Sequence, residues 1–354
     1  MKIFFDNLIY AWQKSGGISI VWTQLLKRML RISMPLRFIE TKECLKNEFR
    51  KTLHIPQTSI IYRSSFLFSF KRYFPIYVKE QNRFIFHSSY YRTCRNRNAI
   101  NIITVHDFTY EKYSTGLKRW VHSFSKYYAI SHADYIICIS QNTKKDLLYF
   151  FPKIKLEKIH VIYNGVNEAY HVLESVNRYS ENIEPFLIFV GARFGYKNFN
   201  IAVECAAIVG MRLVIVGSQL TSQEDLFVSS RLQKKYIVCG FLSENELNRY
   251  YNKAFALIYP SSYEGFGLPV IEAQRAGCPV IAMDRSSIPE IIGNTQLLVE
   301  NENAASFAEK VELLKDASLR KKIIAEGIKN AENFSWDKMA TDYITLYEKI
   351  IKEE

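Results

Sequence analysis

Short apolar runs alternate with amphipathic stretches along this 354-residue chain, and this alternation limits the fold more than any other feature. An apolar run of strand length followed by a segment of helical periodicity is typical of βαβ units, and therefore of parallel sheets. In the first half we expect strands at Lys2–Phe5, Phe84–His87, Ile100–Val105, Tyr135–Ile139 and Ile159–Tyr163. In the second half we expect them at Phe186–Val190, Arg212–Val216, Tyr236–Val238, Ala256–Ile258 and Val280–Ala282. A chain of this length is comfortable for two α/β domains, each with its own core.

Helical periodicity fills the segments between these strands. The expected helices are Ile18–Arg31, Leu117–Ser131, Asn142–Phe150, Phe199–Val209, Glu244–Ala254, Val270–Ala276, Ala304–Lys315 and one after Ser318. The polar stretch from Glu168 to Glu184 lacks periodicity and ends at Pro185, which is typical of a connector between domains. The domains are therefore predicted at 1–168 and 169–334.

A last amphipathic helix is predicted after Ser335, which can cap it. Its apolar face is expected to consist of Trp336, Met339, Ala340, Tyr343, Tyr347, Ile350 and Ile351. Periodicity alone shows that this helix packs on some part of the protein.

Positive charge is concentrated in the first half of the chain. Residues 1–180 hold 28 Lys and Arg against 12 Asp and Glu, a net charge of +16, and the remainder holds 19 against 23, a net charge of −4. A positive half attracts anionic partners such as lipid head groups or lipid-linked diphosphates. The same residues also suit an ordinary solvated surface. Peripheral association with an anionic membrane is therefore one of two interpretations, and no nucleic acid is expected.

Apolar runs such as Phe186–Val190 are far shorter than a membrane span, and Asp6 interrupts what would be the apolar stretch of a signal peptide. The six cysteines lack metal-binding spacing, which favours reduced thiols in a cytoplasmic protein. The segment Ser59–Val78 mixes aromatic residues with Arg63, Lys71 and Arg72. It suits either a lipid head-group boundary or lipid-linked acceptor, or a buried strand and helix whose basic ends reach solvent.

The segment Ser261–Ala282 carries the most specific pattern in the chain. Glu264 and Glu272 flank a glycine-containing turn, Pro269 starts a helix, and Gly277 ends it. A turn that runs into a helix presents unpaired N–H groups beside the positive end of the helix dipole, which suits a phosphate. Carboxylates on either side of the turn can accept hydrogen bonds from hydroxyl groups. The pattern predicts a nucleotide-sugar site, although similar turns also serve as plain connections in α/β proteins.

A second candidate loop, Gly191–Asn198, directly follows an apolar strand and contains Arg193 and Lys197. Ligands of open α/β sheets bind at such strand ends. The chain contains no Asp-x-Asp triplet, a common metal-binding pattern of nucleotide-sugar enzymes. Fixed cations and backbone dipoles are therefore expected to neutralise a departing diphosphate without a metal. The alternative is that both cations are ordinary surface charges.

These segments resemble the retaining GT-B glycosyltransferases of family 4, whose E-x7-E signature matches Glu264 and Glu272. The resemblance continues through Phe189–Asn198, Val238–Leu247 and Phe334–Ala340, and it covers the second half closely and the first half loosely. It implies an α/β GT-B fold of two Rossmann-like domains whose parallel sheets face a central cleft. It also implies that the last helix, 335–354, packs back onto the first, acceptor-binding domain.

The resemblance assigns roles to individual residues. Arg193 and Lys197 match the diphosphate-binding cations, Glu264 the ligand of donor-sugar hydroxyls, and Glu272 the ligand of ribose hydroxyls. Glu272 also fits a helix-dipole partner in the first helical turn. The implied nucleotide-sugar site comprises Gly17, Arg193, Lys197, Asn198, Gly240, Phe241, Glu264, Gly265, Phe266, Gly267, Leu268 and Glu272. The implied catalytic residues are His106, Arg193, Lys197 and Glu264.

Two of these residues lie in the first domain. Gly17 follows Gly16 before a predicted helix, so that its backbone can approach a phosphate closely, and a plain turn fits equally. His106 ends the strand Ile100–Val105 and matches a position near the donor sugar in similar enzymes. A histidine there also fits a satisfied structural residue.

The sequence therefore predicts a metal-independent retaining transferase with no cofactor. It would move a hexose from a GDP- or UDP-sugar to a glycan or lipid-linked acceptor in cell-surface polysaccharide or O-antigen synthesis. The Tyr196–Asn198 and Val105–Tyr110 segments look most like O-antigen-type enzymes, several of which use GDP-mannose, so mannose is preferred. A cytoplasmic location is expected, and the positive half makes the inner face of the membrane a further option.

Three other classes of protein are alternatives to this prediction. A glycoside hydrolase could use Glu264 and Glu272 as paired carboxylates about 5–10 Å apart. A dinucleotide-dependent oxidoreductase needs G-x-G-x-x-G, which neither glycine-containing segment provides. A non-catalytic protein of the same fold stays open as a third alternative.

Overall fold

The computed structural model describes residues 1–14, 16–64, 73–174, 184–293 and 296–353, with the backbone alone for 117–122. It forms two compact units. The first consists of Met1–Gly165 together with Trp336–Glu354, and the second of Val166–Ser335. The sequence placed these boundaries after residues 168 and 334, within a few residues of those seen.

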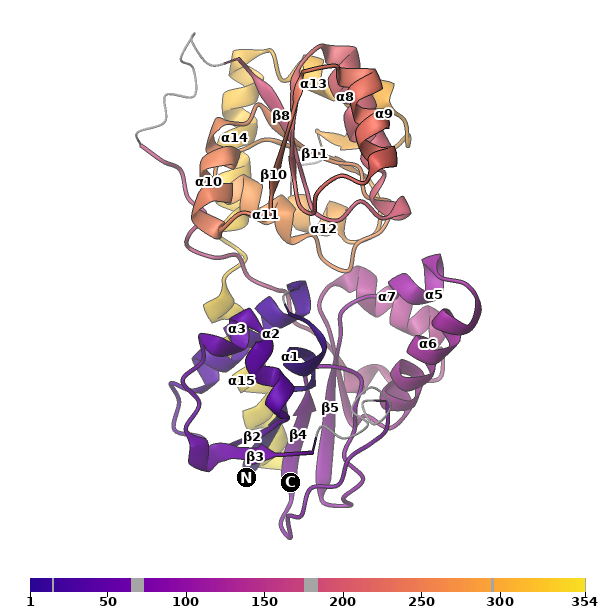
Figure 1. Cartoon of the computed structure of the whole chain (residues 1–354). Coiled ribbons are helices and arrows are strands. Elements are labelled where there is room, and N and C mark those ends of the chain that lie inside the picture. The colour runs from indigo at the N-terminus through magenta and orange to yellow at the C-terminus, as the bar shows by residue number, and fades with distance from the viewer. Residues whose placement is uncertain (15, 65–72, 175–183, 294–295, 354) are drawn as a thin grey trace. The chain divides into compact units, whose positions relative to one another are not determined.

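The first unit is built on a parallel sheet of seven strands in the order β3-β2-β1-β4-β5-β6-β7 (Figure 1). The strands are β1 (Lys2–Asp6), β2 (Leu36–Glu40), β3 (Ile60–Tyr62), β4 (Phe84–Ser88), β5 (Ala99–Val105), β6 (Tyr135–Cys138) and β7 (Ile159–Val161). The strand order reverses between β1 and β4, so successive crossovers run in opposite directions from that point. Because right-handed crossovers then place their helices on opposite faces, both faces of the sheet are covered.

The helices of the first unit flank this sheet, with α2 and α15 side by side and α5 to α7 on the opposite side (Figure 1). They are α1 (Leu8–Trp12), α2 (Gly17–Met29), α3 (Glu48–Lys51), α5 (Thr109–Tyr113), α6 (Gly116–Ser131), α7 (Gln141–Phe150) and α15 (Trp336–Glu353). Short 3-10 turns are η1 (Lys42–Lys46), η2 (Gln57–Ser59) and η3 (Leu156–Lys158).

The second unit contains a parallel sheet of six strands in the order β10-β9-β8-β11-β12-β13. The strands are β8 (Phe186–Val190), β9 (Arg212–Val216), β10 (Tyr236–Gly240), β11 (Ala256–Tyr259), β12 (Val280–Met283) and β13 (Leu298–Val299). Its helices are η4 (Gly195–Lys197), α8 (Phe199–Val209), α9 (Ser222–Leu232), α10 (Glu244–Lys253), α11 (Leu268–Arg275), α12 (Ile288–Ile292), α13 (Ala304–Leu313) and α14 (Ala317–Ala331).

Every strand expected from the sequence is present with ends that agree within two residues, whereas β2, β3 and β13 were missed. The missed strands are short or carry charge. β13 has two residues, and β2 contains Arg37 and Glu40. Glu40 is buried in this strand because Arg50, from α3, neutralises it, a long-range pairing that local patterning does not show.

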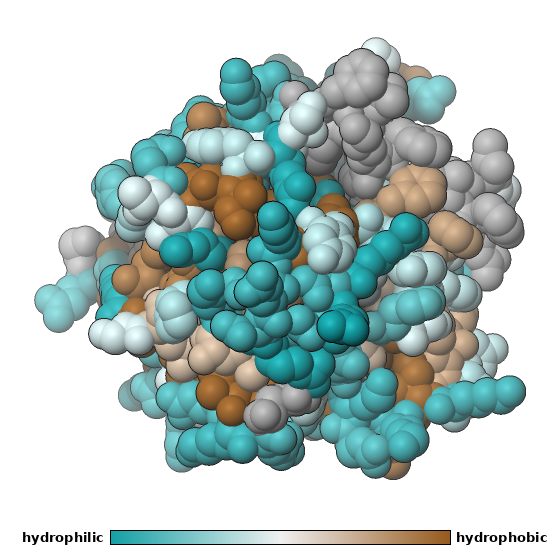
Figure 2. Space-filling model, turned by 90° about the horizontal axis from the view of Figure 1, so that it is seen from below, coloured by the Kyte–Doolittle hydropathy of each residue, from teal (hydrophilic) through white to brown (hydrophobic). Residues whose placement is uncertain are grey.

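Hydrophilic and apolar residues are mixed on the surface of the first unit. Figure 2 looks onto the side on which both termini lie, where hydrophilic residues fill the centre and apolar patches lie around them. Of the segment Ser59–Val78, expected to be either a lipid-facing surface or a buried strand and helix, Ile60–Tyr62 form the strand β3, and residues 65–72, with Lys71 and Arg72, lie outside the described residues. None of the helices in the described ranges combines the length and apolar character needed to cross a bilayer.

The last helix packs on the first unit, as the resemblance implied. Its buried face differs from the predicted one at two positions, because Leu346 is buried and Ile351 is half-exposed.

His87 of β4 lies between two polar groups, one of which belongs to this helix. Nδ1 is 2.6 Å from the Tyr347 hydroxyl, and Nε2 is 3.0 Å from Thr104 Oγ1. Burial lowers the pKa of His87 to about 3, with a contribution from the nearby His106, so this imidazole is neutral at pH 7.

This histidine should make the first unit sensitive to acid. In the unfolded chain His87 becomes protonated below about pH 6.5, whereas in the folded state it stays neutral down to about pH 3. The free energy of unfolding should therefore fall by up to about 1.4 kcal/mol per pH unit as the pH drops through this window. His87→Gln, which does not titrate, should show a correspondingly smaller slope in urea unfolding at pH 6.5, 5.5 and 4.5. Equal slopes in both proteins would contradict the assignment.

Candidate functional site

The strand order of the second sheet reverses between β8 and β11, which are neighbours in the sheet. From β8 the chain adds β9 and β10 on one side, and from β11 it adds β12 and β13 on the other. Loops that leave two such strands diverge and expose a crevice at the carboxyl edge, where open α/β sheets bind ligands. The two loops selected from the sequence, 191–198 and 260–267, leave these two strands.

Lys197 and Glu264 meet across this point. Lys197 Nζ donates to Glu264 Oε1 at 2.5 Å, and the Tyr259 hydroxyl donates to the same oxygen at 2.6 Å. The side chains of Lys197 and Glu264 are 18% and 12% exposed. Within the described residues, Lys197 uses one of its three donors and Glu264 Oε2 accepts no hydrogen bond. A cation and an oriented carboxylate oxygen are thus both open to a ligand at the same place.

Asn198 holds the two loops together. Its backbone is left-handed, with φ of 49°, and its Nδ2 donates to Pro260 O at 3.0 Å and to Ser262 Oγ at 2.7 Å. The Ser262 amide in turn donates to Tyr196 O at 2.8 Å. Asparagine tolerates this conformation better than most residues. Asn198, predicted as a ligand contact, is therefore positioned here as the residue that fixes the loop carrying Lys197.

The turn Gly265–Leu268 leads directly into α11. Gly267 has φ of 105°, a backbone conformation that favours glycine, and a Cβ there would also lie 2.9 Å from Ile288 Cδ1. The Ser287 hydroxyl donates to the carbonyls of Glu264 and Phe266 at 3.0 and 2.9 Å. The Phe266 side chain is buried against Phe334. The turn is therefore rigid, and it leads into the positive end of α11, which suits an anion.

Glu272 lies in the second turn of α11, because the helix starts at Leu268 and Pro269 takes its second position. The first-turn dipole role considered from the sequence is therefore wrong. Burial raises the pKa of Glu272 to about 8, and the negative field of Glu244 adds to this rise. A half-buried carboxyl group of this kind gains from hydroxyl donors that satisfy it.

Arg193 differs from Lys197, although both lie in the same loop. Its side chain is 4% exposed. Nε and Nη2 donate to the two carboxylate oxygens of Glu224 at 2.8 and 3.1 Å, and Nη1 and Nη2 donate to the carbonyls of Ser218 and Gln219 at 2.9 and 2.7 Å. The hydrogen bonds from Arg193 lower the pKa of Glu224 to about 2. The predicted diphosphate cation is thus engaged by the protein itself.

At the end of β10, Gly240 has φ of 67° and its carbonyl accepts from the Gly217 amide at 2.9 Å. Phe241, the next residue, is 85% exposed. An aromatic ring that projects from a strand end offers a flat surface for a nucleobase. Gly240 and Phe241 thus lie at the same edge of the sheet as Lys197.

The two remaining predicted residues belong to the first unit. His106 directly follows β5 and is nearly buried, and burial lowers its pKa to about 4 against the opposing field of Asp107. Gly17 begins α2 with nothing within 4 Å of a Cβ built on it, so neither backbone nor space requires glycine there. His106 is therefore a neutral imidazole at the carboxyl edge of the first sheet.

Several residues of the site were not predicted from the sequence, namely Tyr259, Glu224, Ser287 and Ser286, whose Oγ accepts from the Glu264 amide at 2.8 Å. The Ser286–Ser287 pair before Pro289 was a visible helix-start signal, whereas nothing near Glu224 indicated Arg193 as its partner. All six cysteines are free thiols. Among the described residues, no group of three or more His, Cys, Asp or Glu side chains is placed to hold a metal ion.

Two family profiles match this chain and together cover most of it. Residues 15–170 match the family described as Glycosyltransferase Family 4, and residues 175–330 match the family described as Glycosyl transferases group 1.

Individual relatives are modestly similar. An uncharacterized glycosyltransferase of Methanocaldococcus jannaschii is 27% identical over 99% of both chains. O-antigen chain mannosyltransferase RfbU of Salmonella typhimurium is 29% identical over 62% of both chains. O-antigen chain mannosyltransferase B of Escherichia coli is 37% identical over 30% of this chain and 29% of its own length.

Solved structures share the fold over the whole chain. Sucrose-phosphate synthase from Thermosynechococcus elongatus gives a TM-score of 0.73 at 18% identity, covering 100% of both chains. Anabaena HepE in complex with UDP and glucose gives 0.72 at 15% identity, covering 98% of this chain and 99% of its own. WaaG, a glycosyltransferase involved in lipopolysaccharide biosynthesis, gives 0.66 at 12% identity, covering 97% and 98%. With two parallel-sheet α/β units and family profiles over both, this chain is a GT-B enzyme that belongs to the group 1 glycosyltransferases.

Proposed function

We propose that this glycosyltransferase transfers a hexose from a nucleoside-diphosphate sugar with retention of configuration and without a metal ion. The observation that carries the proposal is the Lys197–Glu264 pair at the strand-order reversal, which leaves cationic donors and a carboxylate oxygen available beside the start of α11. The O-antigen mannosyltransferase relatives favour mannose and therefore GDP-mannose, and the UDP-bound neighbour makes UDP-sugars the second choice.

The reaction follows from the charges at this edge. Lys197 and the positive end of the α11 dipole, at the Leu268 amide, would neutralise the diphosphate as its bond to the sugar C1 breaks. Glu264 Oε2 would accept hydroxyls of the donor sugar, while Tyr259 and Lys197 hold the other oxygen. The acceptor hydroxyl would form the new bond on the same face of C1, and its proton would pass to the departing phosphate oxygen. No protein base is needed in this scheme.

The remaining contacts complete the donor site. Glu272 would accept the ribose hydroxyls, and Phe241 would stack on the base. In the first unit, the neutral His106 would meet the donor sugar or the acceptor. The acceptor would be a glycan or lipid-linked glycan of cell-surface polysaccharide or O-antigen, met in the cytoplasm, with the positive first half favouring an anionic membrane surface.

Arg193 takes a different role in this proposal. Its guanidinium clamps the loop after β9 and the start of α9 to the loop that carries Lys197. At Gly217, next to the clamped Ser218, a Cβ would lie 2.7 Å from Gly191 O, so these loops are closely packed. Arg193 would therefore position the phosphate-binding loop through Glu224, without itself serving as the cation.

Lys197→Met should weaken binding of the donor found in a panel of GDP- and UDP-sugars. Loss of one charge-assisted bond costs about 1.5–3 kcal/mol, which corresponds to roughly a tenfold to hundredfold weaker Kd by calorimetry and a similar loss in kcat/KM. Lys253→Met, at the exposed end of α10, is the matched control and should bind normally. Unchanged donor binding by Lys197→Met would remove this residue from the site.

Removal of divalent ions should leave transfer unchanged. The rate of sugar release from the donor is measured before and after treatment with EDTA, with added Mg²⁺ and Mn²⁺ as the comparison. Loss of turnover that Mg²⁺ or Mn²⁺ restores would contradict the metal-independent part of the proposal.

Glu224→Gln should resemble Arg193→Ala if Arg193 acts as a clamp. Each variant should lower the free energy of unfolding by about 1–3 kcal/mol and weaken donor binding, with the larger loss for Arg193→Ala, which also removes the hydrogen bonds to Ser218 O and Gln219 O. The double variant should add little to Arg193→Ala, because the Arg193–Glu224 contact is already lost there. Asp225→Asn, the adjacent carboxylate, serves as the control. If Arg193 instead binds the diphosphate directly, Glu224→Gln would release it and leave donor affinity intact or improved, whereas Arg193→Ala would lose it.

A further inference from the structure

The first unit contains a pocket of about 590 Å³ at the carboxyl edge of its sheet, within the size range of small-molecule sites. It lies beside the reversal of strand order between β1 and β4, where an open parallel sheet takes a ligand. Polar residues that line it include Asn7, Glu40, Arg63 and Arg92.

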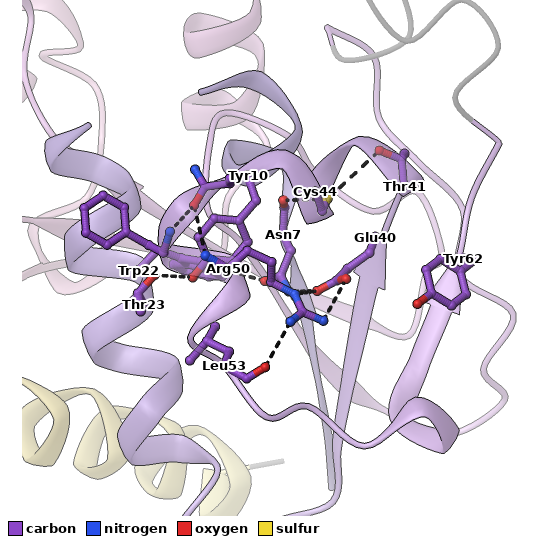
Figure 3. Close-up of polar contacts among 12 residues, drawn as sticks. Asn7, Tyr10, Trp22, Thr23, Glu40, Thr41, Cys44, Arg50, Leu53 and Tyr62 are labelled. Atoms are coloured by element: carbon purple, nitrogen blue, oxygen red, sulfur yellow. Dashed lines mark hydrogen bonds and ion pairs between the residues drawn. The ribbon is translucent and has the colours of Figure 1, made fainter. Parts of the chain in front are cut away.

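A buried polar network forms one side of this pocket (Figure 3). Glu40 Oε1 accepts from Arg50 Nε and from Asn7 Nδ2, both at 2.6 Å, and Arg50 Nη2 donates to Glu40 Oε2 at 3.1 Å. Asn7 Oδ1 accepts from Trp22 Nε1 at 2.8 Å. Since Arg50 neutralises Glu40 and the neighbouring polar atoms are hydrogen-bonded to one another, this side of the pocket is rigid and carries no net charge.

Two other arginines bring positive charge to the pocket. Arg92 pairs with Asp6 through Nε and Nη2, and Arg63 Nη2 donates to Tyr77 O at 2.6 Å. Within the part of the chain that the structure describes, Arg92 Nη1 and the Nε and Nη1 of Arg63 donate no hydrogen bond. Asp6 offsets one of the two charges, so the lining keeps a net positive charge with free guanidinium donors. Such donors suit phosphate oxygens.

The remaining wall is apolar and comes from α1, β2 and the segment that begins at residue 73. Its residues are Leu8, Ala11, Ile39, Phe74, Pro75, Ile76 and Tyr77. Phe74 and Tyr77 are 42% and 60% exposed, so apolar surface continues to the rim. A ligand with only polar groups would leave this wall without contacts, and a purely apolar ligand would leave the arginine donors unused.

We propose that this pocket binds a phosphate ester of an apolar alcohol, with the phosphate at Arg63 and Arg92 and the first carbons along the apolar wall. The ligand would be a lipid-linked acceptor whose phosphate ester is bound here. The acceptor role rests on the proposed function, whereas binding of the phosphate ester rests on the pocket alone.

Geranyl phosphate is the probe, and its binding to the full chain is measured by calorimetry. Geraniol, which lacks the phosphate, and inorganic phosphate, which lacks the chain, should each bind at least tenfold more weakly. Arg63→Gln and the pocket-filling Ala11→Phe should each weaken geranyl phosphate binding at least tenfold. Arg97→Gln removes an exposed arginine outside the pocket and should bind as the wild type does. Circular dichroism and thermal unfolding establish that each variant is folded.

Vesicles of phosphatidylglycerol separate the free ester from a membrane head group. Binding of geranyl phosphate that depends on Arg63 and Ala11, together with vesicle binding that does not, supports the pocket as a site for the ester. Vesicle binding that the two variants abolish, with no binding of geranyl phosphate, overturns the proposal in favour of head-group docking. Equal binding of inorganic phosphate, or no effect of either variant, also overturns it.

The donor assay keeps this inference apart from the proposed function. If the chain binds a nucleotide sugar in a Lys197-dependent manner but not geranyl phosphate, the pocket inference fails and the proposed function stands. If it binds geranyl phosphate but no nucleotide sugar, the proposed donor function fails and the phosphate-ester site stands.

Discussion

The ion pair between Lys197 and Glu264 joins the loops after β8 and β11 at the point where the strand order of the second sheet reverses. Parallel strands bring their carboxyl ends to one edge, and the reversal separates the loops there enough to receive a ligand. Without a ligand, Glu264 neutralises Lys197 in a partly buried place. A diphosphate that binds Lys197 would leave the Glu264 carboxylate able to accept hydrogen bonds from sugar hydroxyls. The two residues of this ion pair would then bind the diphosphate and the sugar of the proposed donor.

Rigid surroundings fix this pair. Asn198 ties the Lys197 loop to Pro260 and Ser262, and Ser287 holds the carbonyls of the Glu264 turn. A site held by backbone-directed hydrogen bonds needs little reorganisation when charge develops on a leaving group. The same logic explains Arg193, whose planar fork matches a carboxylate and two carbonyls at once, whereas a lysine offers a single point charge.

The first unit repeats this use of the carboxyl edge with different chemistry. Its pocket borders a buried Glu40–Arg50 pair, which costs desolvation and is compensated only because Asn7 and the Leu53 carbonyl complete the hydrogen bonding (Figure 3). Two of the many basic residues of the first half, Arg63 and Arg92, line this pocket, and within the described residues each keeps guanidinium N–H groups that donate no hydrogen bond. The two units thus place basic side chains at the carboxyl edges of their two parallel sheets.

The sequence determined the α/β class, the two-unit organisation and most strand positions, because period-2 and period-3.6 patterns are local and survive in a linear reading. It also located the Lys197 and Glu264 loops, since glycine turns at strand ends are local signals too. Only the tertiary structure decided that Arg193 belongs to Glu224, that Glu40 can be buried in β2, and that Arg63 and Arg92 line one pocket. Each of these depends on which residues, distant in the sequence, come together in space. Local sequence patterns do not show such contacts, because they form only in the folded chain.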